Sequence, residues 1–249
     1  ASAQNTRYQL IISNCLKKRI TSALQRFSYI SVRDIWTQNM INHLTRGTIK
    51  SIITPDPVFS FNQNVGDLHN KKYIMEKYNL PEHYVLFSTT QQQFLGSWII
   101  ELAKIFSNHG IKLIELPIAN MSYKEHCIEH ISQAIPPDDW YCLIKYATGY
   151  IGELMHPILV SLHNGTPIYA IDTYGFINHG KFDYTSSKTY QILQNFNLTD
   201  NWFSTHIKQN TPTPNEVFSK IIKFNRELCL QHASRKQYEY NLMMKDILK

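Results

Sequence analysis

One stretch, residues 150–172, constrains the fold more than any other part of the chain. It contains an apolar segment that ends at Gly152, a helix-forming segment that stops at Asn164-Gly165, and a second apolar segment. This pattern predicts two buried parallel strands joined by a helix, since Asn-Gly commonly ends a helix. His156 opens the predicted helix. It would therefore lie at the sheet edge where α/β proteins bind ligands and where the helix dipole favours an anion.

The same alternation of strand and helix patterns begins earlier in the chain. Apolar segments predict strands over 85–88, 111–116 and 141–144, and segments with helical spacing predict helices over 94–108 and 123–134. Strands that alternate with helices are typical of βαβ units. We therefore expect an α/β fold with a parallel sheet.

The beginning of the chain has fewer strand patterns. A helix is expected within 8–27, and strands are expected at 29–32 and 51–53. Asp34 is a suitable N-cap for a helix over 35–44. Two strands are too few for a sheet of ordinary size, so either this part is minimal or residues are missing upstream.

The predicted linker between domains is a polar stretch over 59–72. Beyond Asp172 we expect a polar loop and then a helix over 188–195. A long charged helix over 215–249 either packs back across the domains or lies on a membrane surface. The chain is therefore divided into an N-terminal domain (1–72), a C-terminal domain (73–225) and a C-terminal helix (226–249).

The charge of the chain is modest and dispersed. Its 25 Lys and Arg residues against 19 Asp and Glu give a formal net charge of +6. A nucleic-acid-binding protein usually concentrates positive charge in a recognisable motif, so no nucleic-acid partner is expected. A positive field does suit a small polyanionic substrate.

Cysteine spacing and hydropathy indicate the compartment. Cys15, Cys127, Cys142 and Cys229 show no C-x-x-C spacing, so they predict neither a zinc site nor a disulfide framework, and no other metal cluster stands out. We expect a cytoplasmic protein without a metal. No apolar run approaches membrane-spanning length, so any membrane contact is expected to be peripheral.

Several short motifs follow one another at predicted strand and helix ends. They are Ser31-Val-Arg33-Asp34, Pro55-Asp56-Pro57, Gly152-Glu-Leu-Met-His156-Pro with Asn164-Gly-Thr-Pro167, and Ser186-Ser-Lys188. In this order they resemble the polysaccharide pyruvyl transferases, over about residues 29–198. The resemblance implies two Rossmann-like domains in a GT-B-like arrangement, with the active site in the cleft between them and the N-terminal domain partial. It also implies that phosphoenolpyruvate donates its pyruvyl group to a hexose, as a cyclic ketal, in surface polysaccharide biosynthesis.

By resemblance, Arg33 and Lys188 bind the donor. Phosphoenolpyruvate carries a carboxylate and a phosphate, which a planar guanidinium and an ammonium group can hold. Taken alone, Arg33 would also suit an ion pair, and Lys188 would also suit a solvated surface. Ser186 and Ser187 could add phosphate contacts. Asp34 is placed in the same substrate-binding group, although its side chain also suits a helix cap.

Ketal formation requires a proton donor or acceptor that titrates near neutrality. His156 is the expected catalytic residue, although a histidine in such a turn also suits a structural role. Glu153 is the second candidate, and it could instead stabilise the turn. Asp56 is expected to fix the proline-flanked turn that aligns Arg33.

One position departs from the family pattern. The family usually has Arg two residues before the histidine, and this chain has Leu154. Lys145, His179 and Lys181 are possible substitutes for the missing guanidinium.

Two other functions stay open. One is a GT-B glycosyltransferase that uses a nucleotide sugar. The other is a catalytically impaired binding module, which the Leu154 departure favours. For a pyruvyl transferase, the expected partners are phosphoenolpyruvate and a hexose-containing acceptor, either nucleotide-linked or lipid-linked, and no cofactor is needed.

Overall fold

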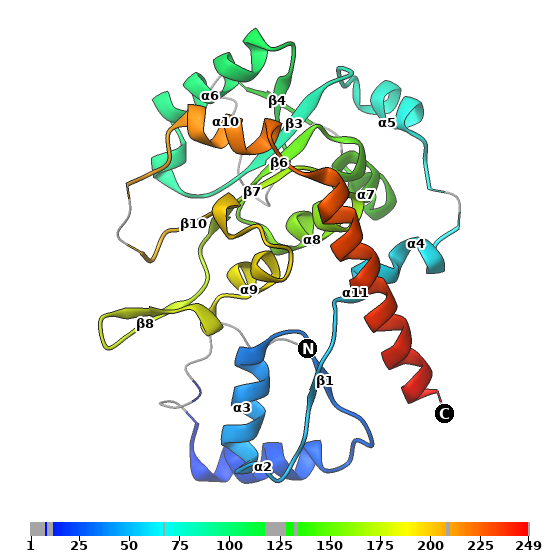
Figure 1. Cartoon of the computed structure of the whole chain (residues 1–249), viewed down its shortest axis with the longest axis vertical. Helices are drawn as coiled ribbons and strands as arrows, with labels where there is room; N and C mark the ends of the chain where they lie inside the picture. The colour runs from blue at the N-terminus through cyan, green and yellow to red at the C-terminus, as the bar shows by residue number, and fades with distance from the viewer. Residues whose placement is uncertain are drawn as a thin grey trace.

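A computed structural model describes residue 8 and residues 12–66, 68–117, 128–131, 134–207 and 210–248 of the 249-residue chain. A larger part contains a six-stranded sheet and a smaller part contains a two-stranded parallel sheet. Figure 1 shows the larger part above and the smaller part below. The predicted fold class, α/β with a parallel sheet, is confirmed.

The large sheet has the strand order of a Rossmann-like domain. Its order is β5-β4-β3-β6-β7-β10, and all neighbouring strands are parallel. Numbered along this part of the chain, that order is 3-2-1-4-5-6, which reverses direction between β3 and β6. Ligands of such sheets bind at that switch point, beyond the carboxyl ends of the strands. The strands are β3 (Tyr84–Ser88), β4 (Lys112–Glu115), β5 (Glu129–His130), β6 (Gly149–Gly152), β7 (Ile168–Asp172) and β10 (Trp202–Ser204).

Helices cover both faces of this sheet. Val85 and Phe87 point to the face covered by α6 (Ser97–Asn108) and α10 (Pro214–Ile222), where they join one apolar cluster. Tyr84 and Leu86 point to the opposite face and join a second apolar cluster. Alternate residues of one strand thus anchor two layers of helices, because successive side chains point to opposite faces. The second layer contains α7 (Pro137–Tyr146), α8 (Met155–Asn164), α9 (Lys188–Asn195) and α11 (Arg226–Ile247), with α5 (Lys71–Tyr78) against α7.

The smaller part is built from the beginning of the chain. It comprises α2 (Asn14–Leu24), β1 (Ser31–Val32), α3 (Ile35–Thr45) and β2 (Ile52–Ile53). The predicted cap is present, because the Asp34 side chain accepts a hydrogen bond of 2.7 Å from Thr37 N. The chain leaves through a 3-10 helix η1 (Pro57–Ser60) and α4 (Phe61–Asn64), which lie within or beside the predicted linker.

The polar segment after β7 is more ordered than the loop that the sequence predicts. It forms an antiparallel hairpin of β8 (Phe176–Asn178) and β9 (Lys181–Asp183). The two turn residues, His179 and Gly180, both have positive φ angles (48° and 77°), as a tight two-residue hairpin turn requires.

Three other predicted elements are wrong. Residues 141–144 are helical and belong to α7, because Pro137 and the acidic first turn start a helix and a continuous apolar run fits either structure. In the predicted helix over 123–134, residues 123–127 and 132–133 lie outside the described residues, and Glu129–His130 is a strand. The predicted C-terminal helix is two helices, because the Asn225 side chain caps α11 by accepting from Leu228 N (3.0 Å).

Candidate functional site

The switch point of the large sheet is held together by Glu153. Ser88 and Gly152, which end β3 and β6, are register partners. Glu153 comes next and is buried. Its carboxylate accepts hydrogen bonds from Thr89 Oγ1 (2.9 Å), Thr90 N (3.0 Å) and Thr90 Oγ1 (2.8 Å). Such donors compensate a carboxylate for the loss of water. Glu153 therefore fixes the turn after β3 to the turn after β6.

Gly152 allows the two strand ends to approach closely. A Cβ at this position would lie 2.3 Å from the Ser88 carbonyl oxygen and 2.4 Å from the Tyr150 hydroxyl. That hydroxyl is hydrogen-bonded to Ser88 Oγ (2.6 Å) and accepts from Leu154 N (3.2 Å). Leu154, the residue that departs from the family pattern, is half-buried at the N-cap of α8.

His156 lies in the first turn of α8 and is exposed. Within the described residues its imidazole has no hydrogen bond or ion pair. Two other residues of α8, Met155 and Leu159, line a cavity. His156 does not line it.

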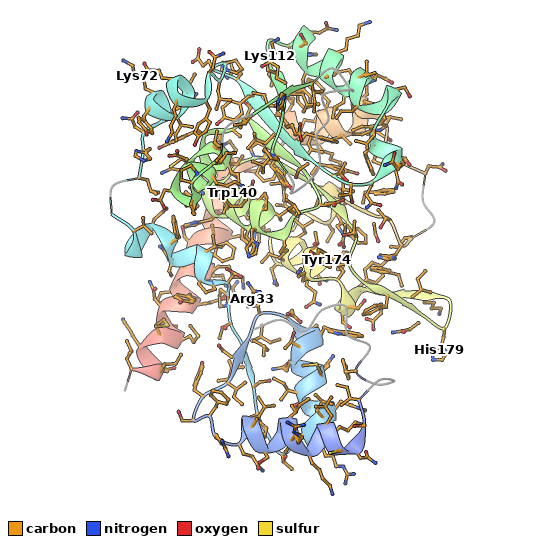
Figure 2. All side chains as sticks on the ribbon, turned by 180° about the vertical axis from the view of Figure 1, so that it is seen from behind. Arg33, Lys72, Lys112, Trp140, Tyr174 and His179 are labelled. Atoms are coloured by element: carbon orange, nitrogen blue, oxygen red, sulfur yellow. The ribbon has the colours of Figure 1, made fainter. Side chains whose placement is uncertain are left out.

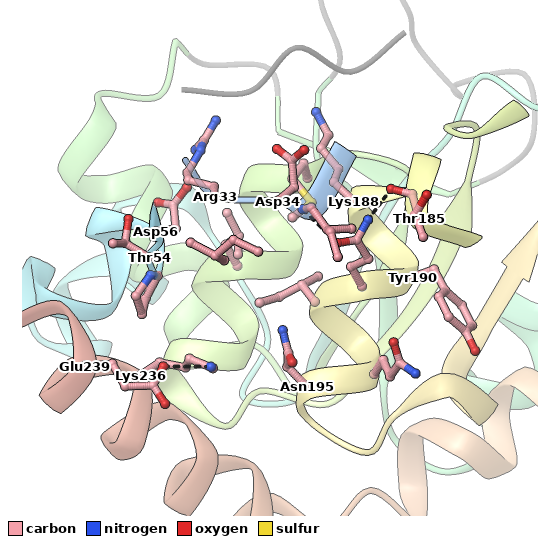
Figure 3. A pocket seen from close by; sticks show the side chains of 18 of the residues that line it. Arg33, Asp34, Thr54, Asp56, Thr185, Lys188, Tyr190, Asn195, Lys236 and Glu239 are labelled. Atoms are coloured by element: carbon pink, nitrogen blue, oxygen red, sulfur yellow. Dashed lines mark hydrogen bonds and ion pairs between the residues drawn. The ribbon is translucent and has the colours of Figure 1, made fainter. Parts of the chain in front are cut away.

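That cavity, of about 650 Å³, lies between the smaller and the larger part. Figure 3 shows it from close by. Its walls come from the β1–α3 junction, the turn after β2, and helices α8, α9 and α11. Of the residues predicted for the site, it brings together Arg33, Asp34 and Lys188.

Arg33 reaches the cavity from the end of β1. Figure 2 shows it near the centre of the molecule, where the two parts meet. Its guanidinium forms an ion pair with Asp56, and 37% of its side chain stays exposed. Asp56 also accepts a hydrogen bond of 3.1 Å from Val58 N. The predicted alignment of Arg33 by this turn is therefore present.

Asp34 has one carboxylate oxygen engaged and one unsatisfied. Oδ1 accepts from Thr37 N (2.7 Å) and Thr37 Oγ1 (2.8 Å). Oδ2 is buried and has no hydrogen-bond partner among the described residues. A buried acceptor without a donor is costly to the folded state.

Lys188 lies at the same end of the cavity as Arg33 (Figure 3). It is half-buried at the start of α9, and its Nζ lies 4.1 Å from the centroid of the Tyr174 ring. Burial lowers the pKa of Lys188, and the nearby Arg33 lowers it further, against the smaller opposing effects of Asp34 and Asp172. Two cations from different parts of the fold thus act on each other, and an anion between them would relieve this repulsion.

Ser186 and Ser187 are fully buried, and neither lines the cavity. Ser186 Oγ accepts from Phe176 N (2.8 Å) and donates to a backbone carbonyl (2.6 Å). Ser187 Oγ donates to the Asp172 carboxylate and caps α9 by accepting from Tyr190 N (2.9 Å). Both hydroxyls therefore already hold the hairpin and the start of α9.

Other lining residues were missed by the sequence reasoning. Gln191 bridges the two parts, because its Oε1 accepts from Ile35 N (3.2 Å) at the start of α3. Asn195 ends α9, and Lys236 and Glu239 extend from α11. Nothing in the sequence distinguishes these residues, since a Lys and a Glu three positions apart are typical of any solvated helix.

The possible substitutes for the missing guanidinium lie elsewhere. Lys145 Nζ is 5.4 Å from the centroid of the Tyr146 ring on α7. His179 occupies the tip of the hairpin, at the edge of Figure 2, and Lys181 follows in β9. None of the three lines the cavity.

Within the described part of the chain, no group of three or more His, Cys, Asp or Glu side chains could hold a metal ion. Cys15, Cys142 and Cys229 are free thiols, and Cys127 lies outside the described residues. No helix in the described ranges has the length and apolar character needed to span a membrane.

The fold and the cavity define a Rossmann-like α/β protein with paired cations where its two parts meet. A family model for polysaccharide pyruvyl transferases matches residues 3–174, which include Arg33 and His156 but not Lys188. The chain belongs to this family.

Three solved structures are similar to this chain at low sequence identity. A putative UDP-N-acetylglucosamine 2-epimerase from Listeria monocytogenes has a TM-score of 0.49 and 11% identity, covering 92% of this chain and 58% of that one. The glycotransferase of kitacinnamycin has a TM-score of 0.45 and 10% identity, covering 92% and 63%. The glycosyltransferase SnogD from Streptomyces nogalater has a TM-score of 0.41 and 12% identity, covering 81% and 58%. The chain thus spans about three fifths of the length of these solved chains. No curated protein matches it.

Proposed function

We propose that the protein transfers the pyruvyl group of phosphoenolpyruvate to two hydroxyl groups of a hexose, forming a cyclic ketal. The observation that carries this proposal is the convergence of Arg33 and Lys188, from separate parts of the fold, on one cavity. Family membership supports pyruvyl transfer to a saccharide, and the paired cations support a donor with two anionic groups. The acceptor in this proposal is a nucleotide-linked or lipid-linked precursor of a surface polysaccharide, and the reaction takes place in the cytoplasm.

In the proposed reaction the donor gains a proton and two bonds to the sugar, and it loses phosphate. The methylene carbon of the donor takes up a proton and becomes a methyl group, and positive charge develops at the adjacent carbon. One sugar hydroxyl attacks that carbon, inorganic phosphate leaves, and a second hydroxyl closes the ring. The two hydroxyl protons account for the new methyl hydrogen and for the proton on phosphate, so no cofactor is required.

Each proposed residue has one task. The Arg33 guanidinium, oriented by Asp56, and the Lys188 ammonium group hold the carboxylate and the phosphate. His156 transfers protons, since its imidazole is exposed at the start of α8 and is not engaged by described residues. Glu153 has its carboxylate engaged by the turn after β3, so we assign it to positioning that turn.

Calorimetric titration with phosphoenolpyruvate tests the donor site. Wild type should bind, Arg33→Ala should lose binding, and His156→Ala should still bind but lose turnover. Arg26→Ala is the matched control, because Arg26 is exposed outside the cavity and its removal changes the net charge equally. Absence of binding to wild type would refute the proposal for this chain, and rescue by Leu154→Arg would then identify a family member with an impaired donor pocket. Binding of a nucleoside diphosphate instead would favour a glycosyltransferase.

A further inference from the structure

The cavity extends well beyond its paired cations. Its volume of about 650 Å³ falls within the range of roughly 300–1,000 Å³ that is typical of sites for larger organic ligands. Figure 3 shows Arg33 and Lys188 at one end, and Asn195, Lys236 and Glu239 at the opposite end. A three-carbon donor held by the two cations would leave this second end unfilled.

The second end contains a cluster of ion-paired side chains. Lys236 Nζ and Glu239 Oε2 are 2.8 Å apart and form an ion pair, with 19% and 33% of their side chains exposed. Glu239 Oε1 also accepts from Arg235 Nε (3.1 Å), so one carboxylate holds two cations, and the uncharged amide of Asn195 lies at the same end of the cavity. Asn195 is exposed, and within the described residues its amide makes no hydrogen bond, so two donors and an acceptor are accessible. This end therefore presents hydrogen-bond donors and acceptors together.

The groups at this end suit a sugar ring. A carboxylate, an amide and an ammonium group can exchange several hydrogen bonds with neighbouring hydroxyls, because they combine acceptors and donors within a small space. Leu159 and Ile192 also line the cavity and provide an apolar surface for the C–H face of a ring. A few placed polar groups on an apolar wall are the usual composition of a specific small-molecule site.

The helix that supplies this end is fixed in place. Cys229 Sγ donates to the Leu162 carbonyl of α8 (3.4 Å), and Ser60 Oγ donates to Asn241 Oδ1 (3.2 Å). Figure 1 shows α11 running from the larger part toward the level of the smaller part. Because α11 is anchored before and after Lys236 and Glu239, the helix that carries these side chains is held in place before a ligand arrives, which lowers the entropic cost of binding.

We propose that Asn195, Lys236 and Glu239 form the acceptor subsite and bind the hydroxyl groups of a hexose ring. This inference rests on the proposed function, since it treats the cationic end as the donor site. All three residues lie beyond residues 3–174, which match the family model. The subsite is thus supplied by helices outside the matched region, and α9 and α11 set which sugar is accepted.

Saturation-transfer NMR tests the subsite directly. The probes are the methyl glycosides of galactose, glucose, mannose and N-acetylglucosamine, with UDP alone as the nucleotide arm. Wild type should bind at least one methyl glycoside. Asn195→Ala and Glu239→Gln should each weaken that binding by about tenfold, as expected for the loss of one or two hydrogen bonds to the sugar. Glu227→Gln is the matched control, because it is the same substitution on an exposed position of α11 outside the cavity.

The outcomes separate this inference from the donor proposal. Arg33→Ala should lose phosphoenolpyruvate and keep the sugar, and Asn195→Ala should do the reverse. If sugar binding is lost in the subsite variants while wild type binds no phosphoenolpyruvate, the subsite stands and the donor proposal fails. If no methyl glycoside binds, if Asn195→Ala and Glu239→Gln bind like wild type, or if UDP alone displaces the sugar, the subsite proposal is wrong.

Discussion

His163 is a buried histidine whose protonation the fold opposes. It lies in α8 and is 8% exposed, its Nδ1 is 3.0 Å from the Tyr141 hydroxyl, and its ring packs on Phe59. Burial, and then the nearby Lys145, lower the pKa of His163 from 6.5 to about 4. Folding stability should therefore depend on pH through this side chain.

The sign and the size of the effect follow from the two pKa values. Above pH 6.5 His163 is neutral in the folded and the unfolded chain, so it adds no pH dependence. As the pH falls below 6.5, the unfolded chain binds the proton first, and stability falls until the folded chain also binds it near pH 4. The complete loss is about 3.4 kcal/mol, of which about 2 kcal/mol is reached by about pH 5.

Urea unfolding at about pH 7.5 and about pH 5 measures this loss. His163→Gln keeps a hydrogen-bonding side chain but cannot be protonated, so wild type should lose about 2 kcal/mol more than this variant over the interval. His83→Gln is the control, because His83 is exposed, and it should behave like wild type. Equal pH dependence of wild type and His163→Gln would refute the reasoning.

Further predictions concern the switch point and the contact between the two parts, and each is measured by urea unfolding. Gly152→Ala should lower the free energy of unfolding by about 1–3 kcal/mol, since a Cβ would lie 2.3 Å from a backbone oxygen. Gly66→Ala is the control, because a Cβ there meets open space and stability should hardly change. Similar losses in both variants would contradict the close-approach argument. Glu153→Gln should lose about 1.5–3 kcal/mol by weakening charge-assisted hydrogen bonds, and an unchanged midpoint would show that they contribute nothing. Gln191→Ala should lose about 1 kcal/mol by removing the bond from Ile35 N, and a gain in stability would count against this bridge.

The sequence predicts those elements whose signals are local. β3 and β7 are fully buried strands, and each is a short apolar run that can be recognised without any partner. The cap of α3 is equally local, because Asp34 bonds to an amide three residues away. The positions of Arg33 and Lys188 at the ends of such elements were therefore accessible from the sequence and the family resemblance.

Elements without a local signal were missed. β10 has only three residues and pairs along β7 alone at the edge of the sheet, so its sequence carries no recognisable period. Lys236 and Glu239 reach the cavity only because α11 packs on α8, which no spacing within α11 reveals. Ser186 and Ser187 show the reverse case. The sequence suggests that their hydroxyls could bind a phosphate, but in the fold both hydroxyls are hydrogen-bonded within the protein, to Phe176 N and to Asp172.

The distance between the two cations is a property of the contact between the parts, not of either cation. Arg33 belongs to the smaller part and Lys188 to the larger part, so binding of one ligand by both depends on how the parts are joined. Trp36 of α3 packs on Phe176 of the hairpin, with ring centroids 5.5 Å apart, and the hydrogen bond from Ile35 to Gln191 lies beside it. The segment after β7, which the sequence predicts to be a polar loop, therefore helps to join the smaller part to the larger part. Residue types for anion binding can be read from a sequence, but the spacing that selects one anion over another is fixed by tertiary contacts of this kind.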